Sequence, residues 1–172
     1  MKKTLGPVIL AAVLLSGGCG YRIGSLMHPQ IQSIAIAPVT NETVAYNVGP
    51  QVRGLLCETF QQDGSLQLKR ESNADCILYA RVVSIKFSQS SWSSINKDDD
   101  ENYVPVQWSV SVGIEYSVVI PGELTPLIAK RNAAGKATFM AGADMETGRT
   151  SGIRQAAFEA AKQVVAQVTE GW

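Results

Sequence analysis

The chain has 172 residues, and its 15 Lys and Arg balance 15 Asp and Glu to a formal net charge of zero. This balance excludes nucleic acid as the main partner, because phosphate neutralisation needs a clear basic excess on the binding face. The length suffices for one domain with a core of its own.

The first 18 residues have the form of a secretion signal. Lys2 and Lys3 provide the positive start, Leu5 to Leu15 form an apolar run, and Ser16 to Gly18 supply small residues for cleavage. The alternative is a transmembrane anchor, but a span needs roughly 20 apolar residues. We therefore expect residues 1–18 to be a signal peptide.

The small residues end at Cys19, and this stretch resembles a bacterial lipobox, although Leu15 stands one position further from the cysteine than is usual. The resemblance implies a covalent N-terminal acyl and diacylglycerol lipid on Cys19, and Gly20 after the cysteine implies the outer membrane. A secreted protein with a free Cys19 thiol is the alternative. We expect residues 19–30 to form the lipidated end and a short tether, and residues 31–172 to form one domain.

The domain begins with a β-rich run, Ile31–Val39, which Pro38 closes. Apolar residues at helical spacing then predict a helix from Val48 to Phe60 that stops at Asp63 and Gly64, with Asn47 or Asn41 as its cap. A second short strand is expected at 66–70.

A long strand is expected from Cys76 to Phe87, with Arg81 intruding on one of its two alternating apolar sets. The polar residues 88–102 predict a loop at a hairpin tip. This loop contains four consecutive acids, Asp98–Glu101, but it lacks the spacing and the glycine of a calcium loop. A solvated loop is favoured over an ion site.

The clearest alternation in the chain lies between Val104 and Ile120, and it predicts a strand with one buried face. The stretch from Leu127 to Met140 is weaker and predicts a strand pair or a bent strand, with Gly135 as a bulge or turn. Helical spacing returns from Ser151 to Val168, with Thr150 or Ser151 as the cap.

The element order therefore predicts an α+β fold. Two amphipathic helices are expected to pack on one face of a mostly antiparallel or mixed sheet of four to five strands, because each helix needs an apolar partner.

No residue pattern indicates catalysis. His28, the only histidine, lies in the tether, so no Ser-His-Asp or Cys-His arrangement can form within the domain. Two acids from distant loops remain the only enzymatic alternative. We expect no enzyme activity, no catalytic residues, no metal and no cofactor besides the lipid. Cys57 and Cys76 are either a disulfide or two buried thiols, and the thiols are slightly favoured.

Basic residues gather in the second half of the chain, among them Lys130, Arg131 and Lys136. Cationic side chains recognise phosphate well, so these three are candidates for contact with an anionic lipid or an acidic partner surface. A solvated surface is the competing interpretation.

Several short motifs together resemble the LptE family of lipopolysaccharide-assembly lipoproteins. They cover almost the whole chain after Cys19, with little match from Leu124 to Gly148. The matching segments are Cys19-Gly20-Tyr21, the strand Ile34–Pro38 followed by Asn41–Thr43, Ala74-Asp75 before a long strand, the strand through Trp108, Glu159–Ala161, and Gly171-Trp172.

This resemblance implies an outer-membrane lipoprotein on the periplasmic face that plugs the LptD β-barrel and helps deliver lipopolysaccharide to the cell surface. The alternative is a periplasmic regulatory lipoprotein that activates a cell-wall synthase. A regulator of that kind needs a long linker, whereas residues 20–30 reach at most about 36 Å. The short tether favours a partner in the same membrane.

Overall fold

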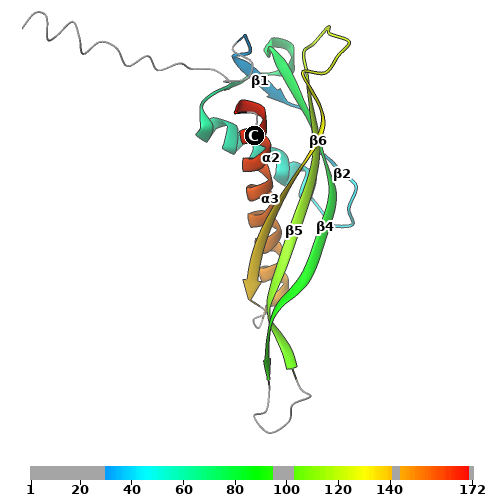
Figure 1. The fold of residues 1–172 in the computed structure, drawn as a ribbon, viewed down its shortest axis with the longest axis vertical. Helices are drawn as coiled ribbons and strands as arrows, with labels where there is room; N and C mark the ends of the chain where they lie inside the picture. Colours follow the sequence, from blue (N-terminus) through cyan, green and yellow to red (C-terminus); the bar gives the residue numbers. More distant parts are fainter. Residues whose placement is uncertain (1–29, 95–102, 141–143, 171–172) are drawn as a thin grey trace, which may run out of the picture.

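The structure is a computed structural model that describes residues 30–94, 103–140 and 144–170. Within these residues, two α-helices cover one face of an elongated, six-stranded mixed sheet (Figure 1). The elements are β1 (Ser33–Ile36), β2 (Thr40–Asn41), α2 (Val48–Asp63), β3 (Gln67–Leu68), the 3-10 turn η1 (Glu71–Asn73), β4 (Cys76–Ser94), β5 (Tyr103–Val119), β6 (Ile128–Met140) and α3 (Met145–Thr169).

The sheet combines a parallel part with an antiparallel part. Its strand order is β3-β1-β4-β5-β6, and β2 also pairs with β4. β1 is parallel to β3 and β4, which requires the crossover that α2 provides. β4, β5 and β6 form an antiparallel meander. The predicted α+β class and the placement of both helices on one face are confirmed. The predicted strand at 66–70 is β3, and the additional short strand β2 brings the sheet to six strands.

A bulge in β4 changes which alternate residues of this strand point toward the helices. Leu78 and Val82 point toward the helices and are fully buried. The register with β5 shifts between Val82 and Ser84, and beyond this bulge Ile85 and Phe87 pack against the same core. The two apolar sets of β4 therefore contribute to one core in succession. The strand also continues to Ser94, through the first half of the predicted loop.

α2 ends as expected, because Gly64 adopts a left-handed conformation (φ 71°) and its N–H bonds to the Phe60 carbonyl. At its start, Asn47 occupies the cap position with φ 58°, but its side chain makes no capping hydrogen bond. Asn47 is thus the cap residue by position, as predicted, but its side chain does not cap the helix; Asn41, the other predicted candidate, lies in β2.

α3 begins six residues before the predicted Ser151. Asp144 caps it by accepting a hydrogen bond from the Thr147 N–H at 3.1 Å, so the prediction of Thr150 or Ser151 as the cap was wrong. The first turns are polar and exposed, which is why the apolar spacing appeared only later.

β6 is one strand, and Gly135 is neither a bulge nor a turn. It pairs in register with Val112, while the irregularity of this strand pair lies between Tyr116 and Val118. A side chain at Gly135 would overlap the backbone of α3 at Ala156 and Ala160. The glycine therefore permits close packing of the helix on the strand.

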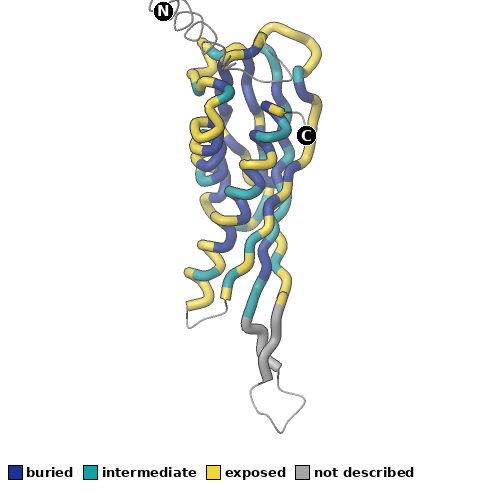
Figure 2. Tube along the Cα trace, turned by 60° about the vertical axis from the view of Figure 1, so that its left-hand side comes forward, coloured by how far each residue is buried: buried dark blue, intermediate teal, exposed yellow. Residues whose placement is uncertain are grey.

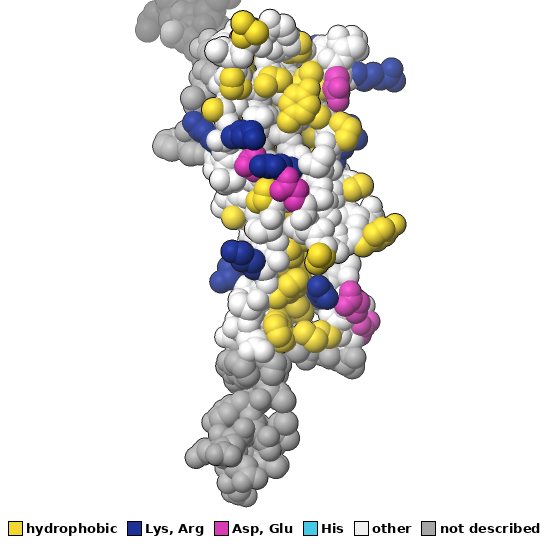
Figure 3. All heavy atoms as spheres, turned by 90° about the vertical axis from the view of Figure 1, so that its right-hand side faces the viewer, with side chains coloured by type: hydrophobic (Ala, Val, Ile, Leu, Met, Phe, Trp, Pro, Cys, Tyr) yellow, Lys and Arg dark blue, Asp and Glu magenta, His cyan; other side chains and the backbone are white. Residues whose placement is uncertain are grey.

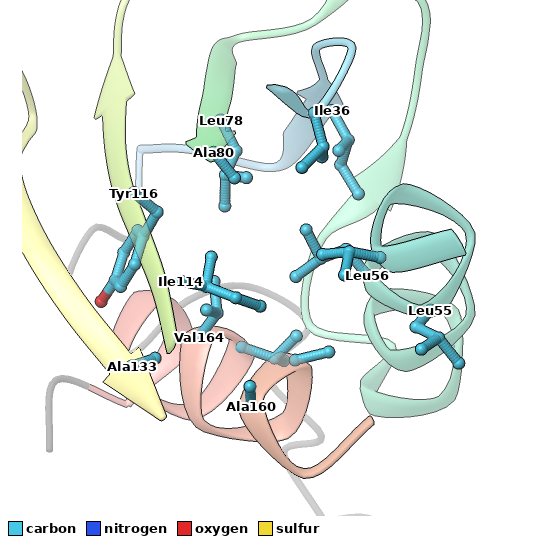
Figure 4. Close-up of a cluster of buried hydrophobic side chains, with 14 of the residues drawn as sticks. Ile36, Leu55, Leu56, Leu78, Ala80, Ile114, Tyr116, Ala133, Ala160 and Val164 are labelled. Atoms are coloured by element: carbon cyan, nitrogen blue, oxygen red, sulfur yellow. The ribbon is translucent and has the colours of Figure 1, made fainter. Parts of the chain in front are cut away.

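The core fills the space between the helices and the sheet (Figure 2). Apolar side chains from α2, α3, β1, β4 and β5 meet there, among them Ile36, Leu56, Leu78, Ile114 and Val164 (Figure 4). On β5, the predicted buried face is confirmed for Val110, Val112, Ile114, Tyr116 and Val118, each at most 1 % exposed.

Candidate functional site

The sheet face that the helices leave uncovered carries a network of four charged side chains. Arg81 on β4 donates to both carboxylate oxygens of Glu115 on β5, from Nε to Oε1 at 3.0 Å and from Nη2 to Oε2 at 3.1 Å. Its Nη1 donates to Glu42 at 2.6 Å, and Lys130 Nζ lies 3.6 Å from Glu115 Oε1. Figure 3 shows alternating basic and acidic side chains across the middle of this face.

The network leaves little charge available for a ligand. The hydrogen bonds from Arg81 hold the pKa of Glu115 below its usual value, and Lys130 adds to this effect. Every nitrogen of the Arg81 guanidinium already faces a carboxylate. A hollow of about 230 Å³ beside the network is shallow and also lined by Tyr79 and Ser117. We interpret the network as a clamp that joins β2, β4, β5 and β6.

The structure does not gather Lys130, Arg131 and Lys136 into one cluster, although all three lie on β6 and are exposed. Lys130 belongs to the clamp. Arg131 pairs in register with Tyr116 and lies close enough to counter the burial that raises the pKa of this phenol. Lys136 is separated from Lys130 by six residues, or about 20 Å along a strand.

Lys136 instead lies in one row with Lys86, a lysine that sequence reasoning missed, with β5 between them. Ser111 on β5 lies opposite Lys86 on β4 and opposite Lys136 on β6. Both lysines are exposed and alternate with residues packed on the helix side, so they project from the uncovered face about 10 Å apart at their backbones.

The row Lys86-Ser111-Lys136 offers two ammonium groups and one hydroxyl to an anion. Neither lysine has a carboxylate partner among the described residues. A phosphate between them would accept hydrogen bonds from both. The register shift after Val82, which sequence alone does not reveal, places Lys86 on this face.

The two cysteines of the described domain are free thiols. Cys57 lies half-buried on α2, and Cys76 is buried at the start of β4. Burial raises the pKa of Cys76 to about 12 and raises that of Cys57 as well. Neither thiol is therefore activated as a nucleophile.

Within residues 30–94, 103–140 and 144–170, neither helix combines the length and the apolar character that crossing a membrane requires. The same ranges hold no group of three or more His, Cys, Asp or Glu side chains arranged to bind a metal. The predicted signal peptide 1–18, Cys19, His28 and the acidic run Asp98–Glu101 lie outside the described residues.

Comparison with known proteins identifies the fold through structure alone. No protein-family model matches the chain, and no curated protein matches its sequence. A Xanthomonas campestris protein of the DUF330 family is 9 % identical with a TM-score of 0.59, covering 81 % of this chain and 85 % of that chain. The hypothetical protein CT253 from Chlamydia trachomatis is 10 % identical with a TM-score of 0.55, covering 81 % and 96 %.

A minor lipoprotein from Acinetobacter baumannii also has this architecture. It is 9 % identical with a TM-score of 0.53, and the match covers 83 % of this chain and 95 % of that chain. These identities are low, so the comparisons establish a shared fold. In all three matches the alignment spans most of both chains.

Proposed function

We propose that the chain is an outer-membrane lipoprotein, anchored through lipid on Cys19, that plugs an LptD-type β-barrel and assists lipopolysaccharide assembly. Its role in this proposal is binding and scaffolding, without covalent chemistry. The shared fold with a solved bacterial lipoprotein supports the anchored part of the proposal.

The observation that supports the barrel assignment is that two segments that resemble the LptE family lie at one place in the fold, where Asp75 of one segment bonds to Ser33, the residue directly before the other. The segment Ile34–Pro38 forms β1 and its exit, and Ala74-Asp75 leads into β4. The Asp75 carboxylate accepts hydrogen bonds from the N–H and the hydroxyl of Ser33, at 2.8 and 2.9 Å. Motifs about 40 residues apart thus meet at one structural joint.

The row Lys86-Ser111-Lys136 is the part of the domain best suited to lipopolysaccharide. Lipopolysaccharide carries anionic phosphate groups, and the two lysines lie in register on the strands that flank β5, on either side of Ser111. Lys136 was expected to contact this lipid, and Lys86 joins it in the proposal.

Crosslinking followed by copurification tests the assignment. Full-length protein crosslinked in Gram-negative cells should copurify with a large outer-membrane β-barrel, identified by mass spectrometry. Recovery of a cell-wall synthase without a barrel would overturn the proposal in favour of the regulatory alternative. As a matched comparison, Cys19→Ser should move the protein from the membrane fraction to the soluble fraction. Unchanged fractionation would contradict anchoring through lipid on Cys19.

The lipid contact is tested separately. Lys86→Glu with Lys136→Glu should lower the yield of a photocrosslink to lipopolysaccharide at Ser111 by about tenfold or more. The control Lys162→Glu changes an exposed lysine on α3, where Glu159 already accepts its hydrogen bond, and should have no effect. An equal yield in both variants would contradict the contact.

A further inference from the structure

β4 has a long edge without a strand partner. β2 pairs with Arg81 and Val82, and the Glu42 N–H donates to the Val82 carbonyl at 3.0 Å. Beyond this point, no described strand pairs with β4 on the β2 side, and no described side chain bonds to the backbone of Val83–Ser90. Half of the backbone donors and acceptors of such a segment point outward and remain available.

The chain turns away from this edge through a local hydrogen-bonded structure. Asn41 Oδ1 accepts from the N–H and the hydroxyl of Thr43, at 3.0 and 2.7 Å, and Asn41 Nδ2 donates to the Ala45 carbonyl at 2.7 Å. The turn leaves the position beside Val83 open. It also projects Val44 and Tyr46, which are 104 % and 96 % exposed.

An open groove of about 590 Å³ lies between this turn and α3. Its walls include Val44 and Tyr46 on one side and Arg149 and Ile153 on the other. The Arg149 guanidinium also lies 4.8 Å from the ring centroid of Phe87, so the groove borders β4 itself.

The charge near the Val83–Ser90 edge of β4 indicates which kind of partner strand this edge would bind. Val83–Ser90 contains Lys86 and no acidic residue, and the neighbouring Arg149 is only weakly offset by Glu146 at 3.9 Å. A second copy paired through the same edge would bring basic side chains together, which is unfavourable. An acidic strand would meet complementary charge.

The other edge of the sheet is less suited to a partner strand. On β6, the Ala134 N–H already donates to Gln163 Oε1 at 3.1 Å, and three exposed cations interrupt the strand. Edge lysines and covered backbone groups are the usual means by which proteins prevent strand addition. The segment Val83–Ser90 of β4 carries one such lysine, Lys86, and no described side chain covers its backbone, whereas β6 carries three cations.

We propose that Val83–Ser90 of β4 binds an extended segment of another protein as an added strand, with apolar side chains alternating with carboxylates. The backbone of the segment would bond to the edge. Its apolar side chains would enter the groove beside Val44 and Tyr46, on the side of the helices, and its carboxylates would lie on the opposite face beside Lys86. The inference is independent of the barrel assignment, because any protein with such a segment fits.

A synthetic peptide of sequence TVEVEVT is the probe, and detergent-solubilised full-length protein is the receptor. The expected result is binding that protects the Val83–Ser90 amides from hydrogen exchange. The same peptide N-methylated at its valines and glutamates should bind at least about tenfold more weakly, because it has lost its internal backbone donors. Equal binding of both peptides, or protection only on β6, would overturn the proposal.

Variants of the protein test whether the groove, and not the surface in general, contributes to peptide binding. Val44→Ser with Tyr46→Ser should weaken binding about fivefold or more, since both side chains are exposed and wall the groove. The matched control Leu124→Ser, which changes a residue that is 103 % exposed in the turn between β5 and β6, should not affect it. Equal weakening by Leu124→Ser would contradict a role of the groove in peptide binding.

A charge exchange tests the chemistry of the occupant. Lys86→Glu should weaken binding of TVEVEVT and strengthen binding of TVKVKVT, and no change in either peptide would contradict the acidic preference. Sedimentation of the peptide-free protein should show a monomer. A dimer that Lys86→Glu alters would instead assign this edge to self-association and overturn the proposal.

Discussion

Arg81 and Glu115 lie in register across β4 and β5 and form a bidentate ion pair, with nitrogen to oxygen distances of 3.0 and 3.1 Å. The pair sits on a solvent-facing sheet surface, so water and salt weaken it. It also joins Glu42 and Lys130, which makes the four side chains energetically dependent on one another.

We expect Arg81→Ala and Glu115→Ala to lower the melting temperature by amounts that are not additive in the double variant. The non-additive part of the change in melting temperature should decrease as the salt concentration rises from about 0.05 M to about 1 M. Thermal melts of the four proteins of this cycle provide the measurement. Additive effects at low salt would show that the two side chains act independently.

Gly135→Ala is expected to destabilise the domain by about 1 to 3 kcal/mol, because the new methyl group would overlap the α3 backbone at Ala156. Gly54→Ala is the matched control on the exposed side of α2, where a Cβ meets nothing within 4 Å. This control should stabilise the protein by about 0.5 to 1 kcal/mol. Urea unfolding measures both, and a neutral Gly135→Ala would mean that α3 can shift without cost.

Asp75 should make the domain sensitive to acid. The hydrogen bond from the Ser33 hydroxyl is the main cause that lowers the pKa of Asp75, with the Gln32 and Ser33 N–H groups adding to it. The carboxylate therefore contributes stability above its ordinary pKa of 3.8, and this is lost as the pH falls through the lowered value. The contribution is roughly 1 kcal/mol at most, since the carboxylate is exposed to solvent.

The comparison of wild type with Asp75→Asn isolates this effect. The difference between their unfolding free energies should be constant between about pH 5 and about pH 8 and should shrink toward about pH 3. Ser33→Ala should reproduce part of the loss at neutral pH. A pH-independent difference would show that the charge of Asp75 contributes nothing.

The thiols Cys57 and Cys76 should differ in their rate of alkylation. Both thiols have raised pKa values, but Cys76 is buried with its pKa near 12, whereas Cys57 is partly accessible. We expect native protein to be labelled at Cys57 first and at Cys76 only upon unfolding. Peptide mass mapping measures the order. In denaturant without reductant both should react, and protection of both would reveal a disulfide.

Local patterns predicted the elements with one consistent buried face. α2 and the strand through Val112 and Ile114 follow from simple periodicity, because each buries a single stripe or face. The α+β class followed from the order of these elements. Their parallel and antiparallel pairing depends on contacts between distant residues, which the pattern of a single sequence does not contain.

The errors in prediction have specific physical causes. The bulge after Val82 made β4 look like a strand with two apolar faces, and Arg81 look like an intrusion. Gly135 resembled a turn because its partner, the α3 backbone near Ala156, comes later in the chain. Lys86 was missed because its position beside Ser111 and Lys136 depends on the bulge and on the strand register.

The length of β4 has a consequence for where this protein can act. Gln32 bonds to Asp75, immediately before the 19-residue β4, so the chain enters the domain at one end of the strand and Ser94 lies at the other. At about 3.3 Å per residue, the strand spans at most about 60 Å. The paired strands therefore fix the distance between Gln32, near the start of the described domain, and any contact made near Ser94.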